Sequence, residues 1–518
     1  MIDVGETSRS DLQTRRTLLK GAAGAVGVAA LGGVALGATH AFDHHHPHRP
    51  PVPTLYSFAN PPAHRVLKVV SQPDLNPPNV AFTGSGTAPG CLFLATSASG
   101  GAHGGPLIVD ERGDPVWFKR NPTDFWASNF RRQLYRGRPM LTWWEGRMTI
   151  EGFGRGEGVI VDSSYREVAR VRAGNGRRMD MHEFLLTSRG TALFVCYPEA
   201  VPADLSPIGG PSNGTARQSV IQEVDVASGR VLFEWRSLEH VGVDETYQRP
   251  AVPLDYIHVN SIDVLPDGNL LVSARCTWSL YKLDRKTGHV IWRLGGKRSD
   301  FQLGDGAVFS WQHDARSPTN STITMFDDGD AGFDDGSGNS NTESQSRGIA
   351  LQVDEQHRTA QLARSYRHPQ PLLADAMGSF QTLPDGHVVI GWGSQPVISE
   401  FSADGKLVAD WRVGSKQSSY RAYRYPWVGR PTDPPALVAR RTGIHGHSLL
   451  FASWNGATGV SDWLVHAGKR ADALRTLGVA KRVGFETVIP LGIKSGYFRV
   501  TALDAQGREL ASSVPARL

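Results

Sequence analysis

The sequence predicts an all-β protein: a six-bladed β-propeller followed by a small C-terminal domain of the β-sandwich type. Three observations support this fold class. The 518 residues include 57 glycines, 32 prolines and 13 tryptophans, and this supply of turn formers and large aromatic residues favours many short strands. A strand-and-turn pattern recurs six times over residues 85–430, which is typical of a propeller. From residue 435 onward the repeat stops, but short strand patterns continue.

The repeat is clearest at residues 265–292. Three stretches there alternate apolar and polar residues. Pro266-Asp267-Gly268 stands at the start of the first stretch and Thr287-Gly288 at the start of the third, as tight turns beside strands do. Residues 383–411 echo this copy. The four weaker copies end at residues 109–117, 161–171, 224–235 and 353–366. Turn aspartates at positions 110, 162, 225, 284 and 354 lie 52 to 70 residues apart, which suits four-stranded blades with loops of different length.

Residues 435–518 predict an accessory β domain similar to immunoglobulin or fibronectin modules. Strand patterns lie at residues 449–454, 461–466, 485–490 and 497–504, with glycine turns between them. Short alternating strands of this kind predict a small sandwich.

The N-terminal residues match an export signal. Arg15-Arg16 precedes an apolar stretch that reaches about residue 38, which is the twin-arginine pattern. We expect residues 1–41 to be this signal, and the protein to pass through the twin-arginine export machinery to the periplasm, the cell envelope or the medium. The alternative is an uncleaved anchor, since the apolar run approaches the ~18 residues of a membrane span, although its six glycines weaken that reading. Otherwise we expect no contact with the membrane.

Residues 42–84 predict a Pro/His-rich linker and an N-terminal strand region that precede the ring. The linker contains His44-His45-His46-Pro47-His48 beside Pro50-Pro51. Such a tract can bind a metal, but it fits a solvated linker better.

Charge and cysteine content exclude two other classes of protein. Basic residues outnumber acidic ones by 55 to 50, which gives a net charge of +5, and no dense Lys/Arg stripe with interleaved aromatic residues accompanies this excess. We therefore expect no nucleic-acid partner. Three cysteines are too few for a disulfide scaffold. We expect Cys91, Cys196 and Cys276 to be buried thiols, with a Cys196–Cys276 disulfide as the alternative.

A histidine stands at a similar point in three consecutive repeats, the third, fourth and fifth. His182, His258 and His313 each lie several residues before the first turn of the repeat, where the innermost strand of a blade would enter the central channel. A single histidine is more often structural, but three in register point to a site at one mouth of the channel. Arg275 lies in the same repeat as His258, and its guanidinium can bind two oxygens of a tetrahedral anion.

Several blocks of the sequence resemble the arylsulfotransferase family. They are DYIHVNSI at residues 255–262, LVSAR at 271–275, WRLGG at 292–296, FSWQHDAR at 309–316 and FDDG at 326–329. The resemblance covers about residues 180–415 and implies a six-bladed propeller. It also implies an enzyme that moves a sulfuryl group from an aryl sulfate to a phenol through a sulfohistidine, with no nucleotide donor, cofactor or metal.

The same resemblance implies roles for four residues. His313 is similar to the nucleophile, and His258 and Arg275 are similar to the groups that hold the sulfuryl oxygens and assist the leaving phenolate. His182 occupies the place of a further active-site histidine, on a shorter local match. The bacterial members with an extra β domain before the first blade use it in dimerisation. This chain has its small domain at the other end, so the resemblance does not imply a dimer.

The residue types suit this chemistry. A neutral imidazole is a competent nucleophile near pH 7, and a covalent intermediate divides one slow transfer into two faster ones. Arg275 and a protonated His258 would stabilise the charge on the sulfuryl oxygens, and a second histidine would exchange a proton with the phenol oxygen. Candidate walls for an aryl pocket are the six tryptophans Trp126, Trp143, Trp144, Trp278, Trp311 and Trp392, although blade core is the commoner place for each of them.

Three other possibilities stay open. Residues 327–336, DDGDAGFDDG, offer oxygen ligands to calcium, but they lack the spacing of an EF-hand and fit a solvated loop better. The whole protein is alternatively a non-catalytic exported propeller that acts as a binding module, because a fold does not fix a function. A calcium-dependent propeller hydrolase would instead place carboxylates and asparagines on the axis.

Overall fold

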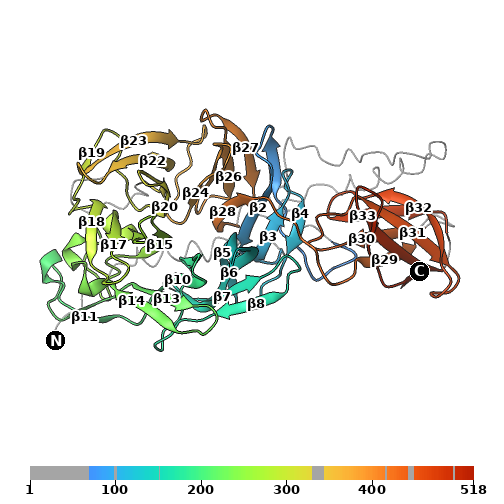
Figure 1. The fold of residues 1–518 in the computed structure, drawn as a ribbon, viewed down its shortest axis with the longest axis horizontal. Coiled ribbons are helices and arrows are strands. Elements are labelled where there is room, and N and C mark those ends of the chain that lie inside the picture. Colours follow the sequence, from blue (N-terminus) through green and yellow to red (C-terminus); the bar gives the residue numbers. More distant parts are fainter. Residues whose placement is uncertain are drawn as a thin grey trace, which may run out of the picture. The chain divides into compact units, whose positions relative to one another are not determined.

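The computed structural model describes residues 69–98, 102–150, 152–329, 344–414, 417–441, 448–493 and 496–518. The expected signal at residues 1–41 and most of the expected linker lie outside the described residues. The described part consists of β-strands and short 3₁₀ turns (Figure 1). Within it, no helix has the length and apolar character that a membrane span requires.

Six antiparallel sheets follow one another around a ring, and we number them as blades 1 to 6 (Figure 1). The strands of each blade are given from the innermost to the outermost. Blade 1 contains β28 (Ser419–Tyr425), β2 (Cys91–Thr96), β3 (Gly105–Val109) and β4 (Pro115–Phe118). Blade 2 contains β5 (Trp126–Tyr135), β6 (Arg138–Met148), β7 (Gly154–Val161) and β8 (Glu167–Val171). Blade 3 contains β9 (Phe184–Leu186), β10 (Thr191–Cys196), β13 (Val220–Asp225) and β14 (Val231–Arg236).

The second half of the ring repeats this order. Blade 4 contains β15 (Val259–Val264), β16 (Leu270–Ala274), β17 (Ser279–Leu283) and β18 (Val290–Gly295). Blade 5 contains β20 (His313–Thr319), β21 (Thr322–Asp327), β22 (Arg347–Asp354) and β23 (Thr359–Tyr366), with β19 (Gln302–Leu303) parallel to β23. Blade 6 contains β24 (Ser379–Thr382), β25 (Val388–Gly391), β26 (Val397–Phe401) and β27 (Leu407–Arg412). The predicted six-bladed fold is confirmed.

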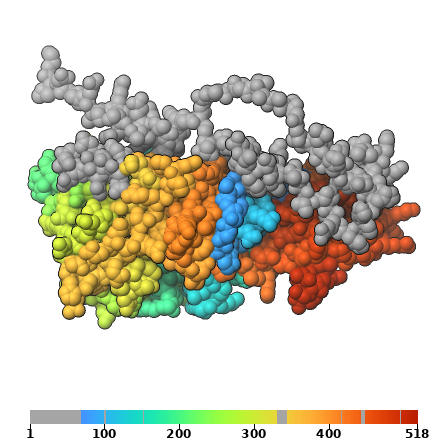
Figure 2. Space-filling view, turned by 90° about the horizontal axis from the view of Figure 1, so that it is seen from above, coloured from blue at the N-terminus to red at the C-terminus, as the bar shows by residue number. Residues whose placement is uncertain are grey.

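Two strands from opposite ends of the ring's sequence close it. The last strand, β28, is the inner strand of blade 1, where it pairs antiparallel with β2. β1 (Ala81–Gly84), from the region before the first repeat, pairs with β27 at the outer edge of blade 6. Figure 2 shows this blue strand lying along the orange blade. A strand from the end of the propeller sequence thus completes blade 1, and a strand from its beginning extends blade 6.

Short elements between the blade strands lie in the connecting segments. They are the hairpin β11 (Val201–Ala203) and β12 (Gly214–Ala216), and the 3₁₀ turns η2 (Ser206–Ile208), η3 (Ser237–Glu239), η4 (Val243–Glu245) and η5 (Arg275–Thr277). The last of these turns carries one of the predicted site residues.

Local chemistry explains why the turn between the third and fourth strands is the clearest part of each repeat. In blade 4, an oxygen of Asp284 accepts hydrogen bonds from the backbone N–H groups of Lys286 and Thr287. Equivalent bonds are made by the aspartates at positions 110, 162, 225 and 354. An aspartate stabilises a turn through such bonds. In blade 6, Ser402 takes this place and accepts from Lys406 N–H.

Tryptophans of the outer strands join successive blades. Trp235 on β14, Trp292 on β18 and Trp411 on β27 are all buried. The indole N–H of Trp235 donates to the carbonyl oxygen of Gly288 in blade 4, at 3.0 Å. The tryptophan near the end of these repeats is therefore a packing residue of the propeller.

The C-terminal residues form two sheets around their own core, as a sandwich requires. One sheet contains β29 (Ala436–Arg441), β30 (Ser448–Ser453) and β33 (Glu486–Leu491). The other contains β31 (Asp462–Gly468), β32 (Arg475–Lys481), β34 (Tyr497–Leu503), β35 (Glu509–Ser512) and β36 (Ala516–Arg517). Both sheets supply residues to one apolar cluster that includes Leu450, Trp463 and Phe498. The prediction of a small C-terminal sandwich is confirmed, although β29, β32, β35 and β36 were missed, because these strands have no buried residue to give an apolar pattern.

The three cysteines are free thiols. Cys196 and Cys276 are buried and Cys91 is half-buried. The expectation of unpaired thiols is therefore correct, and the alternative of a Cys196–Cys276 disulfide is wrong.

Candidate active site

The structure places the three predicted histidines where inner strands enter the ring. His182 lies two residues before β9, His258 immediately precedes β15, and His313 is the first residue of β20. The rings of His182 and His258 are 4.7 Å apart between centroids. Tyr420, on the closing strand β28, lies 5.5 Å from the ring of His182 and 6.3 Å from that of His313. The three imidazoles thus converge from blades 3, 4 and 5 on one end of the channel.

Each of these histidines is held by its own aspartate. The Nδ1 atoms of His182, His258 and His313 lie 2.5, 2.6 and 2.7 Å from carboxylate oxygens of Asp180, Asp255 and Asp328, respectively. A carboxylate at Nδ1 fixes the orientation of the ring and keeps a proton on that nitrogen. In all three residues the chemistry is therefore left to Nε2. These aspartates were not predicted from the sequence.

His182 and His258 share a proton. Their Nε2 atoms are 3.1 Å apart, and both Nδ1 atoms face carboxylates. A contact between two ring nitrogens at this distance requires one hydrogen between them, because two lone pairs would repel each other. The pair therefore carries a proton that can move between the two rings.

His313 has a lone pair at Nε2. The backbone N–H of Met377 donates to this atom at 3.3 Å, so Nε2 is the acceptor nitrogen and the ring proton lies on Nδ1, toward Asp328. Burial lowers the pKa of His313 well below its usual value of 6.5, and the nearby charge of Arg275 lowers it further. Burial also raises the pKa of Asp328, but the direction of the Met377 bond still places the proton of a neutral ring on Nδ1. His313 is thus a neutral imidazole with a nucleophilic nitrogen.

The surroundings of His258 disfavour the protonated ring that is expected from the sequence. Burial lowers the pKa of His258 below 6.5, and this effect outweighs the opposing charge of Asp255. With Nδ1 directed at Asp255, the further proton that His258 can hold at Nε2 is the one it shares with His182. Of the predicted site residues, Arg275 is the one that supplies a permanent positive charge.

Arg275 is the first residue of η5, directly after β16. Its backbone N–H donates to the carbonyl oxygen of His258 at 2.9 Å, which ties the two residues together. Its side chain donates from Nη2 to the carbonyl oxygen of Asp375 at 2.9 Å and lies over the indole of Trp311 at 4.5 Å. The guanidinium thus sits between blades 4 and 5, where its charge reaches His313.

Backbone strain is concentrated at this end of the ring. His258, Trp311, Asp314 and Met377 have φ values of +55°, +56°, +53° and +70°, in the left-handed region that residues other than glycine rarely adopt. Such a conformation costs of order 1–3 kcal/mol per residue and persists only where the surroundings enforce it. Other residues of this kind lie in turns away from the histidines, for example Tyr165 and Arg358, so this feature supports the site without identifying it by itself.

The six tryptophans predicted as walls of an aryl pocket lie in different parts of the propeller. Trp143, Trp144 and Trp392 are fully buried within blades, and the indoles of Trp144 and Trp392 donate to Met179 and Ser399. Trp126 is 44% exposed at the start of β5, and Trp278 and Trp311 lie beside Arg275. Tryptophan sites alone therefore do not identify the pocket.

Three aromatic residues that were not predicted surround the histidines. Phe153 lies 5.5 Å from the ring of His258 and 4.5 Å from that of Tyr197, while Tyr420 forms the floor. The hydroxyl of Tyr197 donates to the carbonyl oxygen of Val259 at 2.6 Å, which fixes its position. These rings offer apolar faces to an aryl group.

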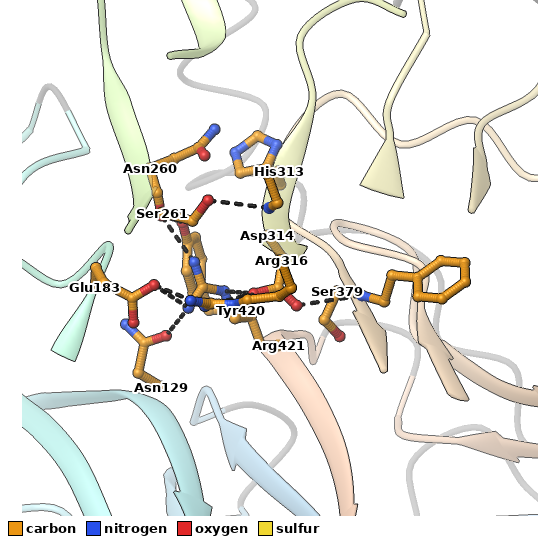
Figure 3. A network of polar contacts seen from close by, with 12 residues as sticks. Asn129, Glu183, Asn260, Ser261, His313, Asp314, Arg316, Ser379, Tyr420 and Arg421 are labelled. Atoms are coloured by element: carbon orange, nitrogen blue, oxygen red, sulfur yellow. Dashed lines mark hydrogen bonds and ion pairs between the residues drawn. The ribbon is translucent and has the colours of Figure 1, made fainter. Parts of the chain in front are cut away.

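A buried network of charges, not predicted from the sequence, fills the channel beneath Tyr420 (Figure 3). Glu183 binds Arg131, Arg316 and Arg421 at 2.6, 2.7 and 3.2 Å. Asp314 binds Arg316 and Arg421 at 2.7 and 3.3 Å. Although burial opposes it, the three arginines hold the pKa of Glu183 well below its usual value. Three guanidinium groups thus face two carboxylates, and Arg421 lies 5.2 Å from the ring of Tyr420.

One sequence signal was available for this network. Glu183 follows His182 and Asp314 follows His313. Because neighbouring residues at a strand entry point in different directions, the acidic residue of each pair turns toward the axis below the histidine. The arginine partners come from blades 2, 5 and 1 and cannot be paired with these acids by sequence spacing.

One group of side chains near the site has the residue types of a metal site. Ligand atoms of Asp255, His258 and Cys276 lie within 4.8 Å of one another, but Asp255 already binds His258, and burial raises the pKa of Cys276 to about 12. A protonated thiol is a poor metal ligand, so the group is better explained as an orienting pair beside a packed cysteine.

The predicted calcium loop and the hydrolase reading also find little support in the described residues. In the loop, Asp327 binds Arg347 at 2.8 Å and Asp328 binds His313, whereas residues 330–336 lie outside the described residues. The axial carboxylates Glu183 and Asp314 are engaged by arginines. In the part of the chain that the structure describes, these oxygens therefore form no cage for a hard cation.

Comparison with solved structures finds similar chains of low identity and low TM-score. A protein of unknown function from Bacteroides caccae has a TM-score of 0.40 and 13% identity, over 65% of this chain and 99% of that one. A protein from Lactobacillus plantarum has a TM-score of 0.32 and 13% identity, over 78% and 99% of the two chains. An inactive virginiamycin B lyase from Staphylococcus aureus, in complex with quinupristin, has a TM-score of 0.30 and 9% identity, over 73% and 93%. No curated protein matches the chain.

A family comparison gives the stronger result. The model described as Arylsulfotransferase (ASST) matches residues 131–414, which is more than half of the chain and includes His182, His258, Arg275 and His313. Membership of this family implies an enzyme with aryl sulfate sulfotransferase activity. The resemblance identified from sequence blocks is therefore confirmed, and the chain belongs to the arylsulfotransferase family.

Proposed function

We propose that this enzyme transfers a sulfuryl group from an aryl sulfate to a phenolic acceptor by a two-step mechanism, with no nucleotide donor and with His313 as the covalent carrier. The observation that carries the proposal is the state of His313: a neutral ring whose Nδ1 faces Asp328 and whose Nε2 holds a lone pair beside Arg275. A nucleophile that remains neutral near pH 7 needs no further activation.

In the first step, Nε2 of His313 attacks sulfur, and the bond between sulfur and the aryl oxygen breaks. The electron pair of that bond leaves with the phenolate, which takes the proton shared by His258 and His182. Arg275 binds the sulfuryl oxygens, where negative charge is concentrated in the transition state. The products are a free phenol and a sulfohistidine.

In the second step, the oxygen of an acceptor phenol attacks sulfur and the sulfur–nitrogen bond breaks. The phenol proton passes to His258 and restores the shared proton of the pair, and His313 regains its lone pair. Asp328 stabilises the positive ring while sulfur is attached, because a carboxylate 2.7 Å from Nδ1 offsets the imidazolium charge.

The buried network supports the same assignment. An excess of guanidinium groups over carboxylates lies under Tyr420, and Arg421 is among the charges that lower the pKa of His313. A positive field beneath the site favours a bound anion. The rings of Phe153, Tyr197 and Tyr420 lie above this field and match the apolar part of an aryl sulfate.

A burst experiment tests the two-step mechanism. Mixing the enzyme with para-nitrophenyl sulfate and no acceptor should release about one equivalent of nitrophenol per enzyme and leave an acid-labile sulfo group on the protein. Addition of phenol should then start steady turnover. Turnover that requires both substrates, with no burst and no labelled protein, would contradict the sulfohistidine but not the transferase. No release of nitrophenol from any aryl sulfate would favour the binding-module alternative.

The pH dependence of this burst follows from the environment of His313. Because burial and the charge of Arg275 lower the pKa of His313, the neutral, nucleophilic form persists as the pH falls. We expect the burst rate to decline only below pH 6.5, the usual value for histidine. Stopped-flow measurements from about pH 5 to about pH 8 would show this decline of the burst rate, with tryptophan fluorescence as a control for folding. A decline of the burst rate with its midpoint above pH 6.5 would contradict the proposed state of His313.

The proposal extends to the location of the enzyme. Arg15-Arg16 and the apolar stretch after it support export through the twin-arginine pathway, which would place the enzyme in the periplasm, the cell envelope or the medium. Retention of an Arg15→Lys, Arg16→Lys variant in the cytoplasm, with export of the native chain, is the expected result of cell fractionation.

A further inference from the structure

A stack of three aromatic side chains connects Arg275 with the outer loops of blade 4. We call Tyr247, Trp278 and Trp311 the aromatic stack. The rings of Tyr247 and Trp278 are parallel with centroids 3.7 Å apart, and Trp278 meets Trp311 edge to face at 5.4 Å. The guanidinium of Arg275 lies over Trp311 at one end, at 4.5 Å. At the other end the ammonium of Lys297 lies over Tyr247 at 4.9 Å.

The backbone holds the stack in a costly conformation. Trp278 and Trp311 have φ values of +50° and +56°, which are genuine outliers for side chains of this size. Both indoles are nonetheless buried, with exposed fractions of 7% and 3%. The indole nitrogen of Trp278 is buried with no hydrogen-bond partner among the described residues. Buried indoles without a hydrogen-bond partner among the described residues also occur in the blades, at Trp143, Trp292 and Trp411, so the left-handed backbone at both Trp278 and Trp311 is what distinguishes the stack from blade packing.

The stack limits the positions that Arg275 can take. A free arginine side chain has several rotatable bonds and loses much conformational freedom when it is ordered. Here the indole of Trp311 covers one face of the guanidinium, and the carbonyl oxygen of Asp375 accepts from Nη2. The remaining N–H groups at the edge of the guanidinium are those suited to bind anionic oxygens. Because Trp311 lies two residues before His313, one backbone segment sets the positions of both the cation and the nucleophile.

We propose that Trp311, supported by Trp278 and Tyr247, is a positioning residue. It holds the guanidinium group of Arg275 in a fixed position and orientation relative to Nε2 of His313. This inference rests on the proposed function. It predicts that Trp311 contributes to the rate only through Arg275, since the indole faces the guanidinium and is assigned no contact with the reacting atoms. Loss of the stack should then slow the chemical step without weakening the binding of the aryl group to the same extent.

A double-mutant cycle tests this coupling. Trp311→Leu, Arg275→Ala and the double variant would be compared with the native enzyme by the rate of the nitrophenol burst. We expect Trp311→Leu to slow the burst about 10- to 100-fold, the range for a misplaced catalytic group, with a smaller change in the aryl sulfate concentration that gives half the maximal rate. In the Arg275→Ala background the same substitution should cost less than about twofold, because coupled residues are not additive.

Two further variants separate positioning from general packing. Trp311→Phe keeps an aromatic face for the guanidinium and should recover most of the lost rate. Trp292→Leu removes a buried tryptophan of blade 4 that packs on Phe301; it should lower the thermal midpoint without slowing the burst in the fraction that stays folded.

The possible failures are distinguishable. If the losses from Trp311→Leu and Arg275→Ala multiply in the double variant, or if Trp311→Leu leaves the burst rate unchanged, the positioning role is wrong while the proposed function stands. Equal losses for Trp292→Leu and Trp311→Leu would also overturn it, because packing alone would explain them. If Arg275→Ala itself leaves the burst unchanged, the role of Arg275 in the proposed function fails, and the inference fails with it.

Discussion

The His313→Ala enzyme should lose sulfuryl transfer, by about 10⁴-fold or more, the scale on which the loss of a covalent nucleophile is measured. The other two histidines cannot replace it, because the Nε2 atoms of His182 and His258 are engaged with each other at 3.1 Å. Among the described residues, the contact of the His313 lone pair is with a backbone N–H, at the longer distance of 3.3 Å. No sulfo group should then be retained on the protein.

The fold should survive this substitution. Removal of the imidazole leaves Asp328 without its partner, but burial already raises the pKa of Asp328, so the carboxyl group can take up a proton and remain uncharged. His357→Ala is a suitable control, because His357 also pairs with an aspartate, at 2.8 Å, but is exposed on an outer turn; it should retain native activity. A sulfo label that persists in His313→Ala at the native level would transfer the covalent role to another residue.

The largest loss of stability is expected for Glu183→Gln. This change keeps the size of the side chain but removes the charge that binds Arg131, Arg316 and Arg421. Guanidinium groups do not lose their protons, so Arg131 would lose its carboxylate partner, while Arg316 and Arg421 would keep Asp314. Removal of one partner from a buried ion pair typically costs about 3 to 5 kcal/mol, which should appear as a lower midpoint of urea unfolding.

Glu145→Gln provides a matched comparison. Glu145 is also buried, with an exposed fraction of 4%, but its partners Lys119 and Arg170 keep 35% and 28% of their side-chain surface exposed. Water can stabilise these cations when the carboxylate is lost, so the cost should be about 1 kcal/mol or less. Similar unfolding midpoints for the two variants would show that the axial network contributes no more than a surface pair.

The features that could be predicted from the sequence are those set by local chemistry. Asp284 and its equivalents accept hydrogen bonds from residues two to three positions later. The turn of each repeat can therefore be recognised from a few consecutive residues. The positions of His182, His258 and His313 follow from the same repeat, because a fixed register from the turn leads to the strand entry. Blade number and site position are therefore readable without knowledge of tertiary contacts.

The features that could not be predicted from the sequence depend mostly on contacts between residues far apart in the chain. Asp180 and Asp255 lie two and three residues before the histidines they hold and could have been found by spacing. Asp328 lies 15 residues after His313, on the far side of a hairpin, and Arg421 reaches Glu183 across 238 residues. Residue type alone does not separate Trp144, in a blade core, from Trp311, beside the site.

The way the ring closes also sets the order in which the site is assembled during synthesis. The floor residue Tyr420 and the axial Arg421 both belong to β28, which the ribosome makes after the strands of all the other blades. Until that strand emerges, blade 1 lacks its inner edge, Glu183 lacks one of its three cations, and no floor lies beneath His182 and His313. A chain that ends before β28 therefore has the three imidazoles but lacks Tyr420 and Arg421, so the synthesis of this strand is the step that completes the site.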